Sequence, residues 1–218
     1  MQTHAPTTIH PVPTRQPGQV RRTQVIEAAI RLFASRGFQG TTTKQIAEAA
    51  GVNEALIFRY FNTKLELYSA IIDHVSEHLS VERWIAEMTP LAQGRDDAAL
   101  FSSLARKIIE NYEGKREVYQ LTLYSALDGH ELARMFRERQ TAPLEKFLEE
   151  YVLERQREGA FGECDALAMI RGFLCMCKHH AMLKVLFGDE YNGLTDEQAV
   201  TNFTHLFLDG ARIRKARS

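Results

Sequence analysis

The sequence predicts an all-α fold. Apolar side chains recur at spacings of three and four residues along most of the 218-residue chain, a pattern typical of amphipathic helices. Runs that alternate apolar and polar residues between tight turns are missing from the sequence. The pairs Asp128-Gly129 and Asn192-Gly193 separate helical patterns and therefore indicate helix ends. We expect about nine helices in total.

The predicted helices follow one another from residue 20 to residue 212. The first covers 20–36 and ends at Gly37, and the fourth begins after Thr63, a hydroxyl cap with Glu66 three positions on. Pro143 falls inside a helical pattern and should kink or divide that helix near Ala142. Further helical patterns lie at about 96–112, 116–127, 130–158, 164–187 and 195–212.

Residues 1–18 have a different composition. They hold four of the six prolines and almost no large apolar side chain. Such a segment buries too little surface to offset the entropy of ordering it. We therefore expect a disordered arm, which leads into the basic residues Arg15, Arg21 and Arg22.

The charges divide along the chain, although the formal net charge is only −1. Residues 1–64 hold eight Lys and Arg against three Asp and Glu, whereas residues 65–211 hold 15 against 25. This asymmetry favours an N-terminal part that binds a polyanion, with chance clustering on solvated faces as the alternative. No apolar run approaches the ~20 residues that span a bilayer, which excludes a membrane protein.

Residues 41–64 predict a helix-turn-helix. A hydroxyl cap at Thr42 or Thr43 starts a short helix that Gly51 ends, and Asn53 can cap a second short helix. The inward faces of the two helices carry Ile46, Ala47, Ala50, Ile57 and Phe61. Small alanines let two short helices cross closely at a tight turn, and the helix at 20–36 completes a three-helix head.

The outward side of the second short helix is placed to enter a DNA major groove. It presents Glu54, Ala55, Leu56, Phe58 and Arg59. Hydroxyl, amide and ammonium groups at helix ends hold phosphates beside the groove, and this role falls to Thr42, Thr43, Tyr60 and Lys64.

At this segment the chain resembles the TetR/AcrR family of transcriptional regulators, over roughly residues 20–70. The matching residues are Ala28, Leu32, Phe33, Gly37, Thr41-Thr42-Thr43, Ile46-Ala47, Ala49-Ala50-Gly51-Val52, Tyr60-Phe61, Lys64 and Leu67. They agree in order and spacing without a gap. Glu54 and Leu56 depart from the polar residues common at their positions, so specificity would rest partly on Lys44, the basic arm and DNA shape.

The resemblance implies a homodimer with two DNA-binding heads and a C-terminal helical domain that binds a small-molecule effector. Such a protein binds a pseudo-palindromic operator in double-stranded DNA, and repression is the common behaviour. Contacts to DNA are then also expected from Lys44 and Asn53. Three segments follow: an arm at 1–18, a helix-turn-helix domain at 19–66, and a ligand-binding and dimerisation domain at 67–218.

The middle of the chain supplies aromatic and methionine side chains that are core residues in most helical proteins. As a hypothesis, some of them line an effector pocket between bundle helices. The residues proposed for this pocket are Trp84, Phe101, Tyr112, Tyr119, Tyr124, Met135, Met176 and His179.

The last two predicted helices are apolar on more than one side, which predicts that each buries two faces. One reading is a four-helix dimer interface, where the family also places it, and the other is an ordinary monomer core. The residues assigned to the interface are Leu167, Ile170, Leu174, Cys177, Ala181, Val200, Phe203, Phe207 and Ala211.

The alternative function is a helical metal-binding protein or enzyme with an incidental basic segment. His74 with His78, and Cys175 with His179, have the i, i+4 spacing of metal ligands, but a site needs three or four ligands. Motifs of di-iron bundles, zinc proteases, serine hydrolases and phosphate-binding loops are missing. We expect no cofactor, no metal and no catalytic residue, and the three cysteines without a signal peptide favour the cytoplasm.

Overall fold

The computed structural model describes residues 17–78, 81–127, 131–188 and 193–212. Over these residues the chain is all-α, as predicted, and a single isolated bridge joins Phe161 to Arg212. The helices are α1 Pro17–Arg36, α2 Thr43–Ala50, α3 Glu54–Tyr60, α4 Lys64–His78, α5 Val81–Gln93, α6 Asp97–Gly114, α7 Arg116–Leu127, α8 Glu131–Phe136, α9 Ala142–Arg157, α10 Ala166–Phe187 and α11 Asp196–Ala211. A π-helical turn at Arg137–Thr141 joins α8 to α9.

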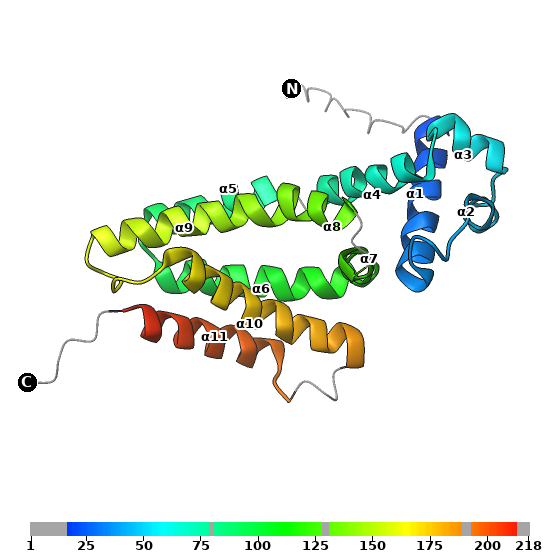
Figure 1. Cartoon of the computed structure of the whole chain (residues 1–218). Helices are drawn as coiled ribbons and strands as arrows, with labels where there is room; N and C mark the ends of the chain where they lie inside the picture. The colour runs from blue at the N-terminus through cyan, green and yellow to red at the C-terminus, as the bar shows by residue number, and fades with distance from the viewer. Residues whose placement is uncertain (1–16, 79–80, 128–130, 189–192, 213–218) are drawn as a thin grey trace, which may run out of the picture.

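The molecule is elongated, with a small head at one end and a helical body at the other (Figure 1). The head contains α1, α2 and α3, and α4 runs from it into the body. Its core is made by α1, by the inner faces of α2 and α3, and by α4 as far as Val75. Val118 and Leu121 of α7 belong to the same buried cluster, so α7 is packed into the core of the head.

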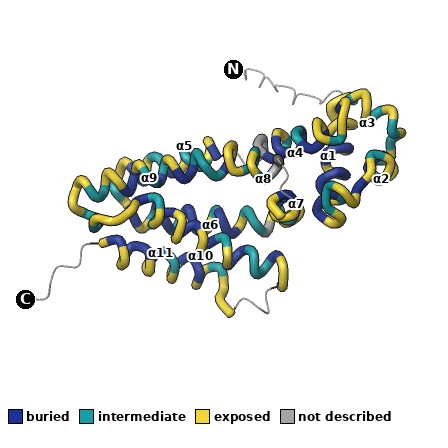
Figure 2. The backbone as a smooth tube through the Cα atoms, viewed as in Figure 1, coloured by how far each residue is buried: buried dark blue, intermediate teal, exposed yellow. Residues whose placement is uncertain are grey.

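The body is a bundle around α6, which packs against α10 and α11 on one side and α5 on another. Its core centres on Phe101, whose ring lies 5.1 Å from that of Phe173 and 4.3 Å from that of Phe207. Figure 2 shows buried backbone along the facing sides of α6, α10 and α11. A polar network closes the far end, where Tyr151 Oη donates to Asp97 at 2.5 Å and Arg155 binds both oxygens of that carboxylate.

The division predicted at Pro143 is confirmed. A proline cannot donate the helix hydrogen bond that its position requires, and the helix accommodates it through the π-helical turn that ends one residue before α9. This turn brings Arg137 and Thr141 to the wall of a cavity described below.

The structure differs from the expected nine helices in two ways. Val81–Gln93 forms α5, which the sequence analysis left unassigned, and the segment 130–158 is split into α8 and α9. The predicted arm lies outside the described residues as far as residue 16. Pro17 and Gly18 are already helical, with Pro17 at the first position of α1, where its fixed φ suits a helix start. The turn residues Asp128, Gly129 and Asn192 also lie outside the described part.

Candidate nucleic-acid interface and ligand cavity

The local sequence explains the geometry of the helix-turn-helix. Thr42 caps α2 because its hydroxyl oxygen accepts a hydrogen bond from the Gln45 amide at 3.2 Å. The Gln45 side-chain oxygen in turn accepts a hydrogen bond from the Thr42 amide, which completes a capping box. Gly51 ends α2 with φ of 65°, a left-handed conformation that glycine adopts without strain. Asn53 Oδ1 then accepts the Leu56 amide at 2.8 Å and caps α3. All three sequence predictions are confirmed.

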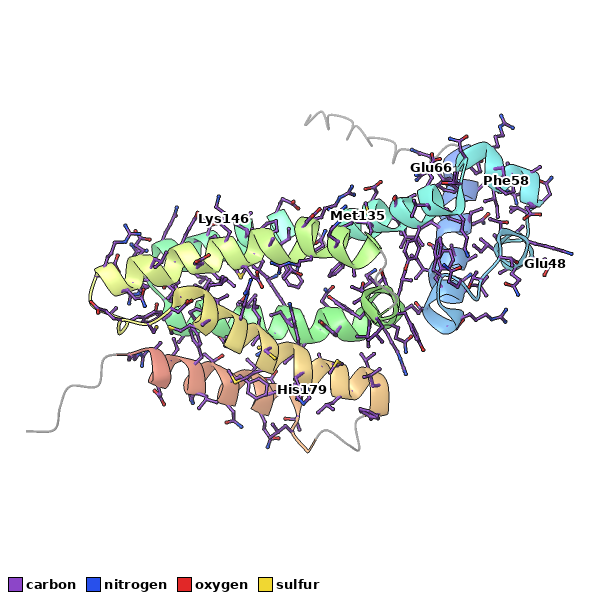
Figure 3. All side chains as sticks on the ribbon, viewed as in Figure 1. Glu48, Phe58, Glu66, Met135, Lys146 and His179 are labelled. Atoms are coloured by element: carbon purple, nitrogen blue, oxygen red, sulfur yellow. The ribbon has the colours of Figure 1, made fainter. Side chains whose placement is uncertain are left out.

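The inner faces of α2 and α3 bury Ile46, Ala47 and Ile57, with Phe61 just beyond the end of α3. The opposite side of α3 is open, and Phe58 is 47% exposed there together with Ala55 and Arg59. Figure 3 shows Phe58 and Glu48 projecting from the outer side of the head. Of the residues predicted to face DNA, those exposed are Thr42, Lys44, Asn53, Ala55, Phe58 and Arg59.

Thr43 and Glu54 are only partly exposed, because they bind each other. The Thr43 hydroxyl donates to the Glu54 carboxylate at 2.5 Å across the turn between α2 and α3. This contact fixes the carboxylate at the first position of α3, where the positive end of the helix dipole also favours a negative charge. Thr43 and Glu54 were each predicted to contact DNA, and in the structure their hydrogen bond joins α2 to α3.

Lys64 corrects part of the predicted interface. Its ammonium donates to the Phe38 carbonyl and lies 4.1 Å from the centre of the Phe38 ring and 5.6 Å from that of Phe33. Burial lowers the pKa of Lys64. The side chain therefore joins α4 to the loop after α1, and its ammonium is held within the head.

The body contains a cavity of about 770 Å³, within the size range of drug-sized ligand sites. Its walls come from α7, α8, the π-helical turn, α9 and α10, with Tyr112 from α6. A smaller, inner cavity of about 70 Å³ lies beside it, toward α5 and α6. Five residues line both cavities and mark the boundary between them: Tyr112, Tyr119, Phe136, Thr141 and Lys178.

Two stacked tyrosines form one side of this boundary. The rings of Tyr112 and Tyr119 are nearly parallel, with centres 3.5 Å apart, and Asn111 donates to the Tyr119 hydroxyl at 2.5 Å. Burial raises the pKa of Tyr112 to about 12 and raises that of Tyr119 further. Both phenols therefore stay neutral at physiological pH and offer aromatic faces and hydroxyl groups, but no negative charge.

The residues predicted for the effector pocket separate into two groups. Trp84, Tyr112 and Tyr119 line the cavities. Phe101 is fully buried in the body core, Met176 packs against that core, and Met135 packs on the head cluster where α8 meets α4 (Figure 3). Tyr124 is 46% exposed, and His179 faces solvent on α10. Neither of these two lines the cavities, so the structure brings together three of the eight predicted residues.

The charged groups of the cavity are not among the residues predicted from the sequence. Lys178 lines both cavities, and Arg134, Arg137 and Glu145 line the larger one. The sequence does contain a signal for Lys178, because this charged residue lies between two apolar runs, Phe173 to Cys177 and Ala181 to Leu183. The others lie on three consecutive segments whose relative rotation depends on the π-helical turn.

Most of the residues predicted for a dimer interface pack within the protomer. Seven of the nine are buried within the protomer, where the inner faces of α10 and α11 pack on α6: Ile170, Leu174, Cys177, Ala181, Val200, Phe207 and Ala211. Leu167 and Phe203 are half-buried. The apolar stripe is therefore a monomer core, and the outer faces of these helices carry other residues: Gly172, Cys175, His179, His205, Leu206 and Asp209.

Within the described ranges, no group of three or more His, Cys, Asp or Glu side chains is placed to hold a metal ion. Cys175 and His179 share an exposed face of α10, whereas the side chain of His78 lies outside the described part. Among the described helices, none has the length and apolarity needed to cross a membrane.

Comparisons with known proteins agree with the head described above. Residues 25–71 match the family of "Bacterial regulatory proteins, tetR family". The chain is 45% identical over 64 residues to the HTH-type transcriptional regulator TtgR of Pseudomonas putida, covering 29% of this chain and 30% of that protein. It is 24% identical over 206 residues to the HTH-type transcriptional regulator RutR of Escherichia coli K12, covering 89% and 92%.

The match to TtgR thus spans less than a third of that relative's length. Among solved structures, the transcriptional regulator FadR of Bacillus subtilis in complex with stearoyl-CoA superposes with a TM-score of 0.66 at 16% identity. The superposition covers 87% of this chain and 99% of that one. The head and the body therefore share one overall fold with that protein.

Proposed function

Because this chain belongs to the TetR family of bacterial regulatory proteins, we propose that it is a ligand-responsive transcriptional regulator. In this proposal it is a repressor that binds a pseudo-palindromic operator as a homodimer. A small-molecule effector in the body cavity releases it from DNA. Residues 19–66 supply the DNA-binding part, and residues 67–218 supply ligand binding and dimerisation.

The position of α7 is the observation that carries this proposal. One side of the helix supplies Val118 and Leu121 to the buried core of the head, where it packs on α1. The other side supplies Tyr119, Leu123 and Ala126 to the wall of the larger cavity. A ligand that displaces α7 must therefore also move α1, because close-packed interiors transmit displacements rather than absorb them.

The charge and shape of the head support DNA as its partner. Lys44 on α2 and Arg59 on α3 are exposed, as is Phe58, while Ile46, Ala47 and Ile57 of the two helices are buried. The exposed Thr42 caps the N-terminus of α2, where backbone amides suit a phosphate. This arrangement supports base contacts from α3 and phosphate contacts from the start of α2.

The outer faces of α10 and α11 support a dimer. Leu206 is 64% exposed there, and Gly172 has open space above it that allows a second helix to approach closely. Leu206→Glu should shift the protein toward monomers in sedimentation velocity, because it places a charge in the contact. Leu153→Glu, at a residue 42% exposed on α9, is the matched control and should leave the mass unchanged. A monomeric wild type would contradict the dimer.

DNA binding is tested by fluorescence anisotropy with labelled DNA from upstream of the protein's own coding region. Affinity should fall steeply with salt, because binding releases counterions from the phosphates. Lys44→Ala should weaken binding and reduce the salt dependence. Lys146→Ala, which removes an exposed lysine from α9 in the body, should change neither. Salt-insensitive binding, or equal effects of both variants, would contradict the assignment.

A further inference from the structure

Lys178 is the unusual residue of the cavity. It lies on α10 among the residues Phe173 to Leu186, which are mostly apolar, and it lines both the larger and the inner cavity. Its ammonium can donate three hydrogen bonds. Within the described residues, however, it makes neither a hydrogen bond nor an ion pair. A partly buried cation without a partner is costly, so a cavity that keeps one is suited to an incoming anion.

The acidic residue that lines the larger cavity, Glu145, lies near two arginines. Glu145, whose side chain is 11% exposed, lies 3.5 Å from Arg137 and 3.5 Å from Arg171, beyond ordinary charge-assisted hydrogen bonds. It attracts Lys178 at longer range and partly offsets the effect of burial, which nevertheless lowers the pKa of Lys178. The lowered pKa agrees with a poorly solvated ammonium group whose nearest negative charge is shared with two arginines.

The other cations of the cavity lie at its rim. Arg134 and Arg137 have side chains 58% and 57% exposed; Arg134 is paired with Glu138, and Arg137 shares Glu145 with Arg171. They raise the local positive potential but are largely exposed to solvent. Lys178 is the cation placed at the inner boundary, where it meets aromatic surface. A ligand that reaches it must leave water, so charge complementarity there decides which ligands enter.

Around Lys178 the walls are mostly apolar. The aromatic residues Tyr112, Tyr119 and Phe136 lie at the boundary, Met182 and Val185 follow on α10, and Trp84 faces the inner cavity. We propose that this cavity takes an amphiphilic monocarboxylate, whose carboxylate is bound by the Lys178 ammonium while its apolar body lies along these walls. This inference rests on the proposed function of the cavity as the effector site.

The test is calorimetric titration with two matched pairs of probes. Dodecanoate and dodecan-1-ol, below micellar concentrations, share a chain, and naphthalene-2-carboxylate and naphthalene-2-carboxamide share a ring system. Wild type should bind at least one carboxylate more tightly than its neutral partner by about tenfold or more, as expected for a charge-assisted hydrogen bond. Fluorescence of Trp84, the single tryptophan, should report dodecanoate and dodecan-1-ol at the inner cavity.

Lys178→Met keeps the length and apolar character of the stem and removes the charge. It should lose about tenfold to a hundredfold in affinity for the carboxylate and leave affinity for the neutral partner within about threefold. Retained binding of the neutral probe also shows that the variant is folded. Lys146→Met, at an exposed lysine on α9, is the matched control and should leave both affinities unchanged (Figure 3).

Three outcomes would overturn the proposal: neither carboxylate binds, carboxylate and neutral probes bind wild type equally, or Lys178→Met weakens both equally. The DNA titration separates this inference from the proposed function. If the carboxylates bind as described but the chain does not bind DNA, the ligand class stands and the regulatory role fails. If DNA binds and the carboxylates do not, the regulatory role stands and the ligand class is wrong.

Discussion

Leu121 and Leu123 offer a matched pair of substitutions on α7. Leu121 is 1% exposed in the head cluster, whereas Leu123 is 42% exposed and lines the larger cavity. Replacing either by alanine removes the same three carbon atoms. At Leu121 the substitution removes carbon atoms that are almost fully buried, so their transfer free energy from water is lost, and it also leaves a new void between α7 and α1. We expect Leu121→Ala to lower the free energy of unfolding by about 3 kcal/mol.

Leu123→Ala should cost about 1 kcal/mol or less, because part of its side chain already contacts water and the rest faces an existing cavity. Urea unfolding followed by circular dichroism measures both differences under the same conditions, and equal slopes would show that the unfolded states are comparable. The larger loss should fall on the head, so hydrogen exchange of α1 amides should accelerate in Leu121→Ala before that of α6 amides. Equal losses for the two variants, or a larger loss for Leu123→Ala, would refute the assignment of opposite faces of α7.

Three further predictions concern the frame that holds the two sites. Gly51→Ala should lower the free energy of unfolding, measured with urea, by about 1 kcal/mol, because φ is 65° while no atom lies within 4 Å of the added carbon. An unchanged free energy of unfolding would contradict this conformational cost. Arg155→Met should lower the free energy of unfolding by about 3–5 kcal/mol, since it leaves the buried Asp97 carboxylate with Tyr151 alone. A similar decrease in the exposed Arg157→Met control would exclude this reason. Burial raises the pKa of Asp196, but hydrogen bonds from Lys184 at 2.7 Å and His180 at 2.8 Å lower it more. The ionised carboxylate therefore stabilises the fold above its ordinary pKa of 3.8, and this contribution is lost as pH falls through the lower pKa of the folded state. Asp196→Asn should therefore destabilise the protein at pH 6, and the difference from wild type should shrink on acidification below pH 4; a difference that grew instead would reverse the sign of the shift.

Much of the head was predictable because its determinants are local. The caps at Thr42, Asn53 and Thr63 each act on a backbone amide three residues away, and the structure has all three. Lys64 was assigned to phosphate because its partner, the Phe38 carbonyl, lies 26 residues away in sequence. A long side chain at a helix start is equally compatible with either contact until the helices are packed.

The body was less predictable, since its features depend on how helices face one another. The apolar stripes of α10 and α11 indicate burial, but the same stripe suits a partner chain or the chain's own α6, and the structure shows α6. The cavity is a space left between six elements, which no single residue encodes. Helix α5 has a helical apolar pattern from Val81 through Met88 to Ala92, yet Pro90 in its last turn is a residue that more often marks a helix end.

The proposed regulation depends on coupling between the cavity and the head through α7. The most direct measurement is the DNA affinity of the wild-type protein by anisotropy, with and without dodecanoate at a concentration that saturates the Trp84 signal. We expect dodecanoate to weaken DNA binding by about fivefold or more, and DNA to weaken dodecanoate binding by the same factor, as linkage requires. Dodecanoate bound in the cavity with DNA affinity unchanged would contradict this coupling.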